Sequence, residues 1–88
     1  MAARNLRRAS LLGPKPARRV WLKREIAKTD VQLDLLEDHI RAQQERIEEF
    51  ERAGGETAAA RDFLVTLQDC QEAHQIYRLR LARDLEAT

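Results

Sequence analysis

The segment Ala53-Gly54-Gly55-Glu56-Thr57 separates two long, charge-rich stretches that contain neither glycine nor proline. A glycine in the left-handed conformation often closes a helix, and Gly54 is placed to do so. Thr57 is placed to cap the helix that follows, with its hydroxyl accepting from an amide of the first turn. A short break between two long amphipathic helices turns the chain back on itself. The alternative is one continuous helix weakened by two glycines, at a cost of only about 2 kcal/mol.

The stretch before the break carries apolar residues at intervals of seven. Ile26, Leu33, Ile40 and Ile47 form one row. A second row consists of Leu22, Thr29, Leu36, Gln43 and Phe50. Such a pattern is typical of a helix that packs along one seam, as in a coiled coil. Polar residues inside a seam often fix the register of the helices, and we interpret Thr29 and Gln43 in this way.

The stretch after the break carries a wider apolar stripe with the same helical spacing. Residues equally distant from Gly55 should face one another in a hairpin, which pairs Ile47 with Phe63. The predicted helix-helix seam contains Ile26, Leu33, Leu36, Ile40, Ile47, Phe50, Phe63, Leu67, Cys70, His74, Tyr77 and Leu81.

The sequence therefore predicts an all-α, coiled-coil-like antiparallel hairpin of two helices with a basic N-terminal arm. The arm covers residues 1–19, and prolines at positions 14 and 16 are expected to break any helix there. The hairpin covers residues 20–88, with helices at about 20–53 and 57–87 and a turn at 54–56.

Apolar side chains outside the seam suggest that the hairpin does not stand alone. Two helices of this length bury too little surface for much stability. Five apolar residues lie on the outer faces near the open end: Trp21, Val31, Leu35, Ile76 and Leu79. Scattered surface hydrophobes are normal, but we interpret these as an oligomer patch and expect a homodimer that forms a four-helix bundle.

Charge is distributed unevenly along the chain. The body from residue 25 onward is acidic, whereas the first 24 residues contain no acid. They contain eight bases, namely Arg4, Arg7, Arg8, Lys15, Arg18, Arg19, Lys23 and Arg24. Such a segment could bind phosphates of a nucleic acid in a salt-dependent manner, dock on an acidic partner subunit, or serve as a solvated tail. It lacks an accompanying nucleic-acid-binding motif, and membrane attachment is less favoured because only three leucines accompany the charges.

No motif in the sequence predicts catalysis, a cofactor or a metal. Cys70 and His74 are four residues apart, so both could project from one helix face toward a metal, with His39 or Asp38 as further ligands. Cysteine and histidine at seam positions are more often packing residues, and a two-helix seam offers no cleft for a substrate. We expect no enzyme.

The segment from about residue 36 to 85 resembles a group of short helical proteins of uncharacterised function from alphaproteobacteria, particularly rhizobial types. The resemblance rests on four motifs: His39-Ile40-Arg41, Gln44-Glu45-Arg46-Ile47, Ala53-Gly54-Gly55-Glu56-Thr57 and Phe63-Leu64-Val65-Thr66-Leu67. Phe63 stands where that group usually has leucine. The resemblance implies a bacterial cytoplasmic setting and no activity.

Taken together, these features predict a non-catalytic interaction or structural protein that self-associates and can bind a partner through helix packing and its basic arm. The alternative is a small nucleic-acid-associated protein that works through the arm. The resemblance implies a cytoplasmic location, and a single cysteine gives no sign of an oxidising compartment. The acid-free, arginine-rich start is also typical of an organellar presequence.

Overall fold

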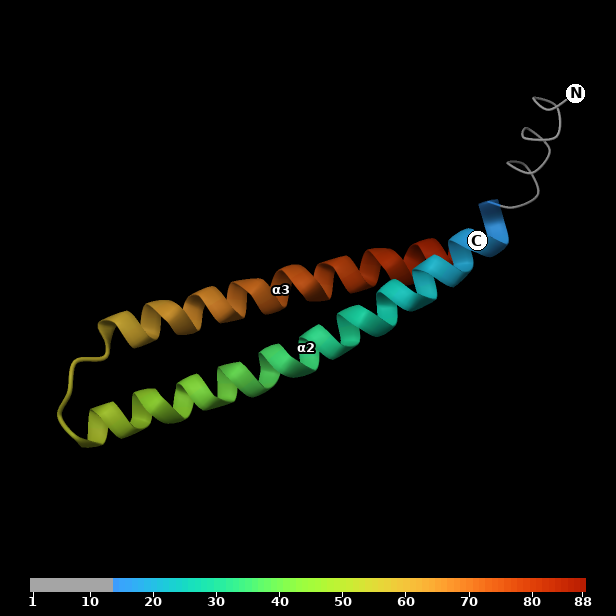
Figure 1. Cartoon of the computed structure of the whole chain (residues 1–88). Coiled ribbons are helices and arrows are strands. Elements are labelled where there is room, and N and C mark those ends of the chain that lie inside the picture. Colours follow the sequence, from blue (N-terminus) through green and yellow to red (C-terminus); the bar gives the residue numbers. More distant parts are fainter. Residues whose placement is uncertain (1–13) are drawn as a thin grey trace, which may run out of the picture.

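A computed structural model describes residues 14–88 of the chain, and side chains from Pro16 onward. It contains helix α2, Pro14–Arg52, and helix α3, Ala58–Ala87, with no strand in the described range. The two helices run side by side in opposite directions and contact each other along their lengths (Figure 1). The prediction of an all-α antiparallel hairpin is confirmed.

Helix α2 begins six residues before the predicted start at Val20, which is a correction to the predicted arm of residues 1–19. The first residues of a helix have amides without an intrahelical acceptor, so a proline there gives up no hydrogen bond. Pro14 and Pro16 therefore fit the first turn of α2 instead of breaking it. Arg18 and Arg19 consequently belong to α2.

The turn at the end of α2 has the hydrogen bonds of a Schellman motif. The Gly55 amide donates to the Phe50 carbonyl at 2.8 Å, and the Gly54 amide donates to the Glu51 carbonyl at 3.1 Å. Gly54 has a φ of 72°, a left-handed conformation in which a side chain would be strained. A Cβ on Gly55 would lie 3.3 Å from the Phe50 carbonyl oxygen. Both glycines are thus required by the break, and a continuous helix is excluded.

Thr57 precedes α3 but does not cap it as predicted. Its ψ of 1° departs from the extended backbone of a usual N-cap, and its hydroxyl makes no capping bond. Instead, the Glu56 carboxylate accepts from the Ala58 amide at 3.0 Å, while the Thr57 hydroxyl accepts from Arg61 Nε at 3.0 Å. A carboxylate near the positive end of a helix serves the same purpose.

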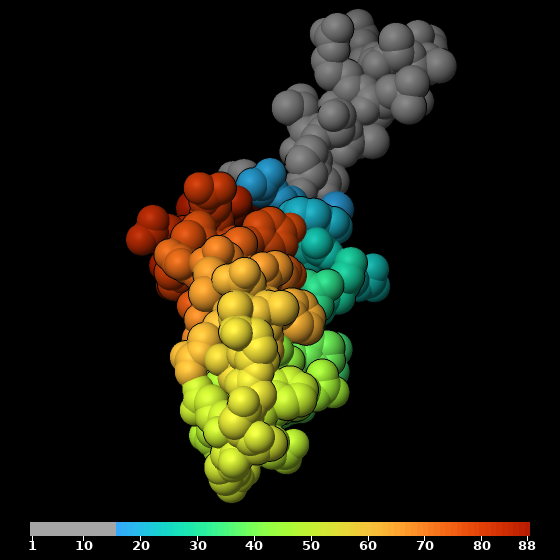
Figure 2. All heavy atoms as spheres, turned by 90° about the vertical axis from the view of Figure 1, so that its left-hand side faces the viewer, coloured from blue at the N-terminus to red at the C-terminus, as the bar shows by residue number. Residues whose placement is uncertain are grey.

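The core is a single row of side chains between the helices. Its buried apolar members are Leu22, Ile40, Ile47 and Leu81. The remaining predicted seam residues Ile26, Leu33, Leu36, Leu67, Cys70 and His74 are half-buried. Within residues 14–88 each helix has one neighbouring helix, so it keeps much of its perimeter in solvent (Figure 2). Within residues 14–88, neither helix is long and apolar enough to cross a membrane.

Two polar side chains are also buried in this row, but they bond differently. Thr29, 2 % exposed, donates its hydroxyl to the Glu25 carbonyl of its own helix at 2.7 Å. Gln43, 6 % exposed, donates from Nε2 to the Ala60 carbonyl of α3 at 2.9 Å. Gln43 therefore joins the two helices, whereas Thr29 is satisfied within α2.

Candidate functional site

The two sides of the α2–α3 seam have different chemistry. On one side, which we call the Phe63 face, two heptad rows of α2 flank one row of α3. The α2 rows are Trp21, Lys28, Leu35, Ala42 and Glu49, and Glu25, Gln32, His39 and Arg46; the α3 row is Phe63, Cys70, Tyr77 and Asp84. On the other side, the Arg61 face, Asp30 and Glu51 of α2 meet Arg61 and Arg78 of α3. Residues seven apart share a side of a helix in a supercoiled pair, which assigns each row to its face.

Ion pairs across the seam cover the Arg61 face. Arg78 binds both carboxylate oxygens of Asp30, one through Nε and the other through a terminal nitrogen at 3.3 Å. Arg61 bridges to Glu51 beside the turn. The shallow hollow on this side is lined mainly by polar residues, with Ile47 and Leu64 as its apolar members. A charged and polar surface of this kind is typical of surface that stays in contact with solvent, and not of the core of an interface with another helix.

The carboxylates that cross the seam should make stability depend on pH. The hydrogen bond from Arg78 lowers the pKa of Asp30 below its ordinary 3.8, and the hydrogen bond from Lys28, with one from Tyr77, lowers the pKa of Glu25 below 4.5. A carboxyl group whose pKa is lower in the folded than in the unfolded state stabilises the fold at pH values above its unfolded-state pKa. This stabilisation is lost as the pH falls through the folded-state pKa.

We therefore expect the urea midpoint to be constant from neutral pH down to about pH 5 and to fall below about pH 4. Asp30→Asn should lower the midpoint at neutral pH and reduce its fall in acid. Asp34→Asn, which alters an exposed aspartate one turn further along α2, is the matched control. Equal acid sensitivity of the two variants would contradict the role of Asp30.

The Phe63 face exposes large apolar side chains along much of the hairpin. Trp21 is 52 % exposed, Leu35 55 %, Phe63 52 % and Tyr77 40 %. Phe50, at the turn end of α2, is also exposed. Assigning Phe63 and Tyr77 to the buried seam was wrong, because the wide apolar stripe of α3 extends beyond the strip that one neighbouring helix can cover. Assigning Phe50 to it was also wrong, since this side chain lies exposed in the last turn of α2.

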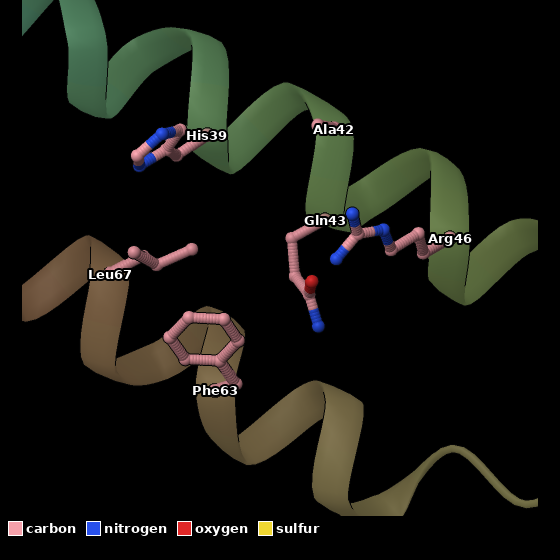
Figure 3. A pocket seen from close by; sticks show the side chains of 6 residues that line it. All are labelled: His39, Ala42, Gln43, Arg46, Phe63 and Leu67. Carbon is pink, nitrogen blue, oxygen red and sulfur yellow. The ribbon is translucent and has the colours of Figure 1, made fainter.

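A hollow of about 220 Å³ lies in the Phe63 face. Its α2 wall is formed by His39, Ala42, Gln43 and Arg46, and Phe63 and Leu67 form the α3 wall. Figure 3 shows the side chains of Phe63 and Leu67 on α3 and of Gln43 on α2 in the space between the two helices. The four α2 residues have the spacing i, i+3, i+4, i+7, which is the arrangement that receives one side chain of a neighbouring helix in knobs-into-holes packing.

The five residues of the predicted oligomer patch are all exposed, but they do not form one surface. Trp21 and Leu35 lie on the Phe63 face. Val31 is two residues after buried Thr29, and Leu79 two before buried Leu81, so each points about 200° away from the seam. Ile76 also lies on the outer side of α3. One partner cannot cover Val31 and Leu79 together, because they point in opposite directions.

Two bases of the predicted anion-binding arm are used within the hairpin. Arg18 forms an ion pair with Asp84 at 3.6 Å, and Arg19 donates to the Leu85 carbonyl at 3.2 Å, where the end of a helix attracts a cation. Lys23 and Arg24 are exposed on α2. Arg4, Arg7 and Arg8 lie outside the described residues, as does the Lys15 side chain. The predicted cations are thus not one continuous free surface.

Cys70 and His74 lie together on α3, as their spacing predicted. The Cys70 sulfur is 3.6 Å from His74 Nδ1, and this nitrogen lies 2.8 Å from the Cys70 carbonyl, to which it donates in the matching tautomer. In the described part of the chain, no three histidine, cysteine or carboxylate side chains are grouped closely enough to hold a metal. The pair is accounted for by local hydrogen bonding.

Comparison with protein-family models, curated proteins and solved structures gives no match. The class of the molecule is therefore defined by its fold, an all-α helical hairpin with exposed aromatic and aliphatic side chains on one side of the seam and with ion pairs that join the two helices on the other.

Proposed function

We propose that this chain is a non-catalytic helical interaction protein that self-associates as a homodimer and acts in the cytoplasm. The observation that carries the proposal is the Phe63 face. Four large apolar side chains there are each at least 40 % exposed, as many as the apolar side chains that are fully buried within residues 16–88. Exposed apolar patches of this kind mark interaction sites.

The shape of the site supports helix packing over binding of a small molecule. Ligand sites are concave, enclose most of a ligand's surface and usually have volumes of roughly 300–1,000 Å³, whereas the hollow at Phe63 measures only about 220 Å³. The groups that could act chemically around it, His39 and Arg46, are both exposed on a solvent-facing helix surface. These features favour an interface over an active site.

Sedimentation equilibrium of the full chain at micromolar concentration tests the proposal. We expect a mass twice that of the chain, with partial dissociation on dilution, because packing the Phe63 face removes its aromatic side chains from water. A compact monomer at all concentrations would contradict self-association. In that case the same face would have to receive a helix of another protein, which is the second kind of occupant that its surface suits.

A further inference from the structure

Charge is divided along the length of the hairpin, between the open end and the end that carries the turn. We call residues 16–30 and 73–88 the open half and residues 31–72 the turn half. The open half contains eight basic and four acidic residues, whereas the turn half contains four basic and eleven acidic residues. The hairpin therefore has a positive end and a negative end, separated along helices that are about 45 and 58 Å long.

The two rows that point away from the seam follow the same division. Their residues are Arg24, Val31, Asp38, Glu45 and Arg52 on α2, and Asp62, Asp69, Ile76 and Arg83 on α3. Each row has a base in the open half and two acids in the turn half, and only Arg52, in the last turn of α2, departs from this order. These rows form the two edges of the hairpin, so they border any helix pair that packs on the Phe63 face.

A second copy can cover the Phe63 face in two directions. A two-fold axis parallel to the helices stacks each half on the same half of the other copy, so the acidic turn halves meet. A two-fold axis perpendicular to the helices, in the plane of the interface, stacks the open half of each copy on the turn half of the other. Like charges oppose association, whereas opposite charges favour it and fix the orientation. The division of charge therefore selects the perpendicular axis.

We propose that the Phe63 face docks on the Phe63 face of a second copy that runs in the opposite direction, with the open half of each copy on the turn half of the other. This inference rests on the proposed self-association and specifies its geometry. The perpendicular axis places α2 over α2 of the second copy and α3 over its α3. All neighbouring helices in the resulting four-helix bundle are antiparallel.

The register follows from overlap along the whole hairpin. Helix α2 and the turn after it cover residues 14–55, so α2 residues whose numbers sum to about 70 come opposite each other. Leu35, which is exposed in one hairpin, then packs beside Leu35 of the second copy at the axis. In the row nearest the seam, Glu25 comes opposite Arg46 of the second copy. Arg46 forms no ion pair within residues 16–88, so its charge is free for this contact.

The charges next to this contact alternate in sign. Lys28 binds Glu25 at 2.9 Å in each hairpin, and Glu49 follows Arg46 by three residues. Along the interface the order is therefore Glu49 and Arg46 of one copy, followed by Glu25 and Lys28 of the other. Each of these four side chains has its nearest charges of opposite sign.

The edges of the bundle agree with this register. Arg24 comes level with Glu45 of the second copy at the edge formed by the two α2 helices. The bonds that already join α2 to α3 across the seam place the axis near Cys70 of α3. At the edge formed by the two α3 helices, Asp62 therefore comes within about one turn of Arg80 of the second copy. Both edges bring together a base and an acid.

Ionic strength tests the direction, because the two axes predict changes of opposite sign. Salt shortens the distance over which charges act, from about 10 Å at 0.1 M to about 3 Å at 1 M. Screening weakens the attraction between unlike halves, so the dimer dissociation constant of the parent chain should rise several-fold with sodium chloride. Stacked like halves would instead associate more tightly. Sedimentation equilibrium measures this, and a dissociation constant that stays constant or falls would contradict the proposal.

A charge exchange between two variants of the full chain tests the contact. Arg46→Glu and Glu25→Lys each place like charges at both symmetric contacts, so each should raise the dimer dissociation constant about tenfold. An equimolar mixture should form a heterodimer, which native mass spectrometry detects, because one contact is native and the other is restored with exchanged charges. Glu25 also binds Lys28 and Tyr77 in its own hairpin, and recovery in the mixture separates a lost contact between copies from a lost fold.

The matched control is Asp34→Lys, which changes the net charge as much as Glu25→Lys does. Asp34 is exposed near the midpoint of α2, on the side away from the Phe63 face, so this variant should dimerise like the parent. If Arg46→Glu and Glu25→Lys also dimerise like the parent, this contact is wrong while self-association survives. If they dissociate and their mixture does not associate, α2 does not face α2 of the second copy. A parent chain that is monomeric at every salt concentration would remove the proposed function as well.

The position of the two turns has an independent readout. In a Cys70→Ser background, a spin label introduced by Glu56→Cys marks the turn of each copy. Turns at opposite ends of the bundle should place the two labels about 50 Å or more apart, since α2 alone is about 58 Å long. Turns at the same end would place them within roughly 30 Å, because helices in contact lie about 8–10 Å apart. The shorter distance would overturn the proposed direction.

Discussion

Leu22→Ala should leave the chain largely unfolded at room temperature. Among residues 16–88, Leu22 is the most deeply buried side chain, with no exposed surface, and it lies toward the open end of the hairpin, as does Leu81, which is 3 % exposed. Removing a fully buried leucine side chain costs about 3 kcal/mol, from lost apolar burial and from the cavity left behind. A core this small supplies only roughly 3–5 kcal/mol in total. One truncation therefore removes most of the stability.

Far-ultraviolet circular dichroism with urea titration measures this directly. The parent chain should give one cooperative transition, whereas Leu22→Ala should begin to unfold without denaturant. Leu79→Ala is the matched control, because it is the same substitution at a side chain that is 56 % exposed on the outer side of α3. Its free energy of unfolding should change by less than about 0.5 kcal/mol. Comparable effects of the two variants would show that the open end does not depend on buried packing.

The hairpin could be predicted from sequence because its signals are local or strictly periodic. The left-handed conformation of Gly54 could be predicted because glycine has no side chain to oppose it. The rows of residues seven apart identify the side of α2 that faces α3. Leu22, Ile40 and Ile47 are buried as these rows require. The start of α2 was missed because Pro14 and Pro16 were interpreted as a break, although proline disrupts a helix only beyond its first turn.

The candidate site was less predictable, because it depends on how the helices are rotated against each other. Counting residues from Gly55 pairs Ile47 with Phe63, but Ile47 lines the hollow of the Arg61 face together with Leu64, and Phe63 lines the other. Adjacent residues differ by 100° around a helix, so a small rotation decides which of them faces the partner. Periodicity identifies an apolar stripe, but it does not locate the edge of the stripe that remains exposed.

Gln43 should fix the register of the two helices at a cost in folding stability, and two substitutions separate these effects. Gln43→Ala removes the bond to the Ala60 carbonyl and leaves a void beside Phe63, so the free energy of unfolding should fall by about 2 kcal/mol. Gln43→Leu fills the same space with an apolar group, and replacing a buried polar residue in this way is often neutral or stabilising. We expect it to match or exceed the parent by about 1 kcal/mol in urea unfolding.

Gln43→Leu should instead reduce the specificity of the helix register, and this loss should appear in the assembly. A buried polar residue in a helix seam restricts the register, because any other register leaves it without a partner. Without the bond between Gln43 and Ala60, neighbouring registers of α2 and α3 become closer in free energy, and sedimentation should show a broader distribution of masses. Thr29→Val is the matched control, because Thr29 is buried but bonds only to the Glu25 carbonyl of its own helix. It should leave the mass distribution unchanged. If Thr29→Val broadens the distribution as much as Gln43→Leu does, the bond between the helices is not what fixes the register.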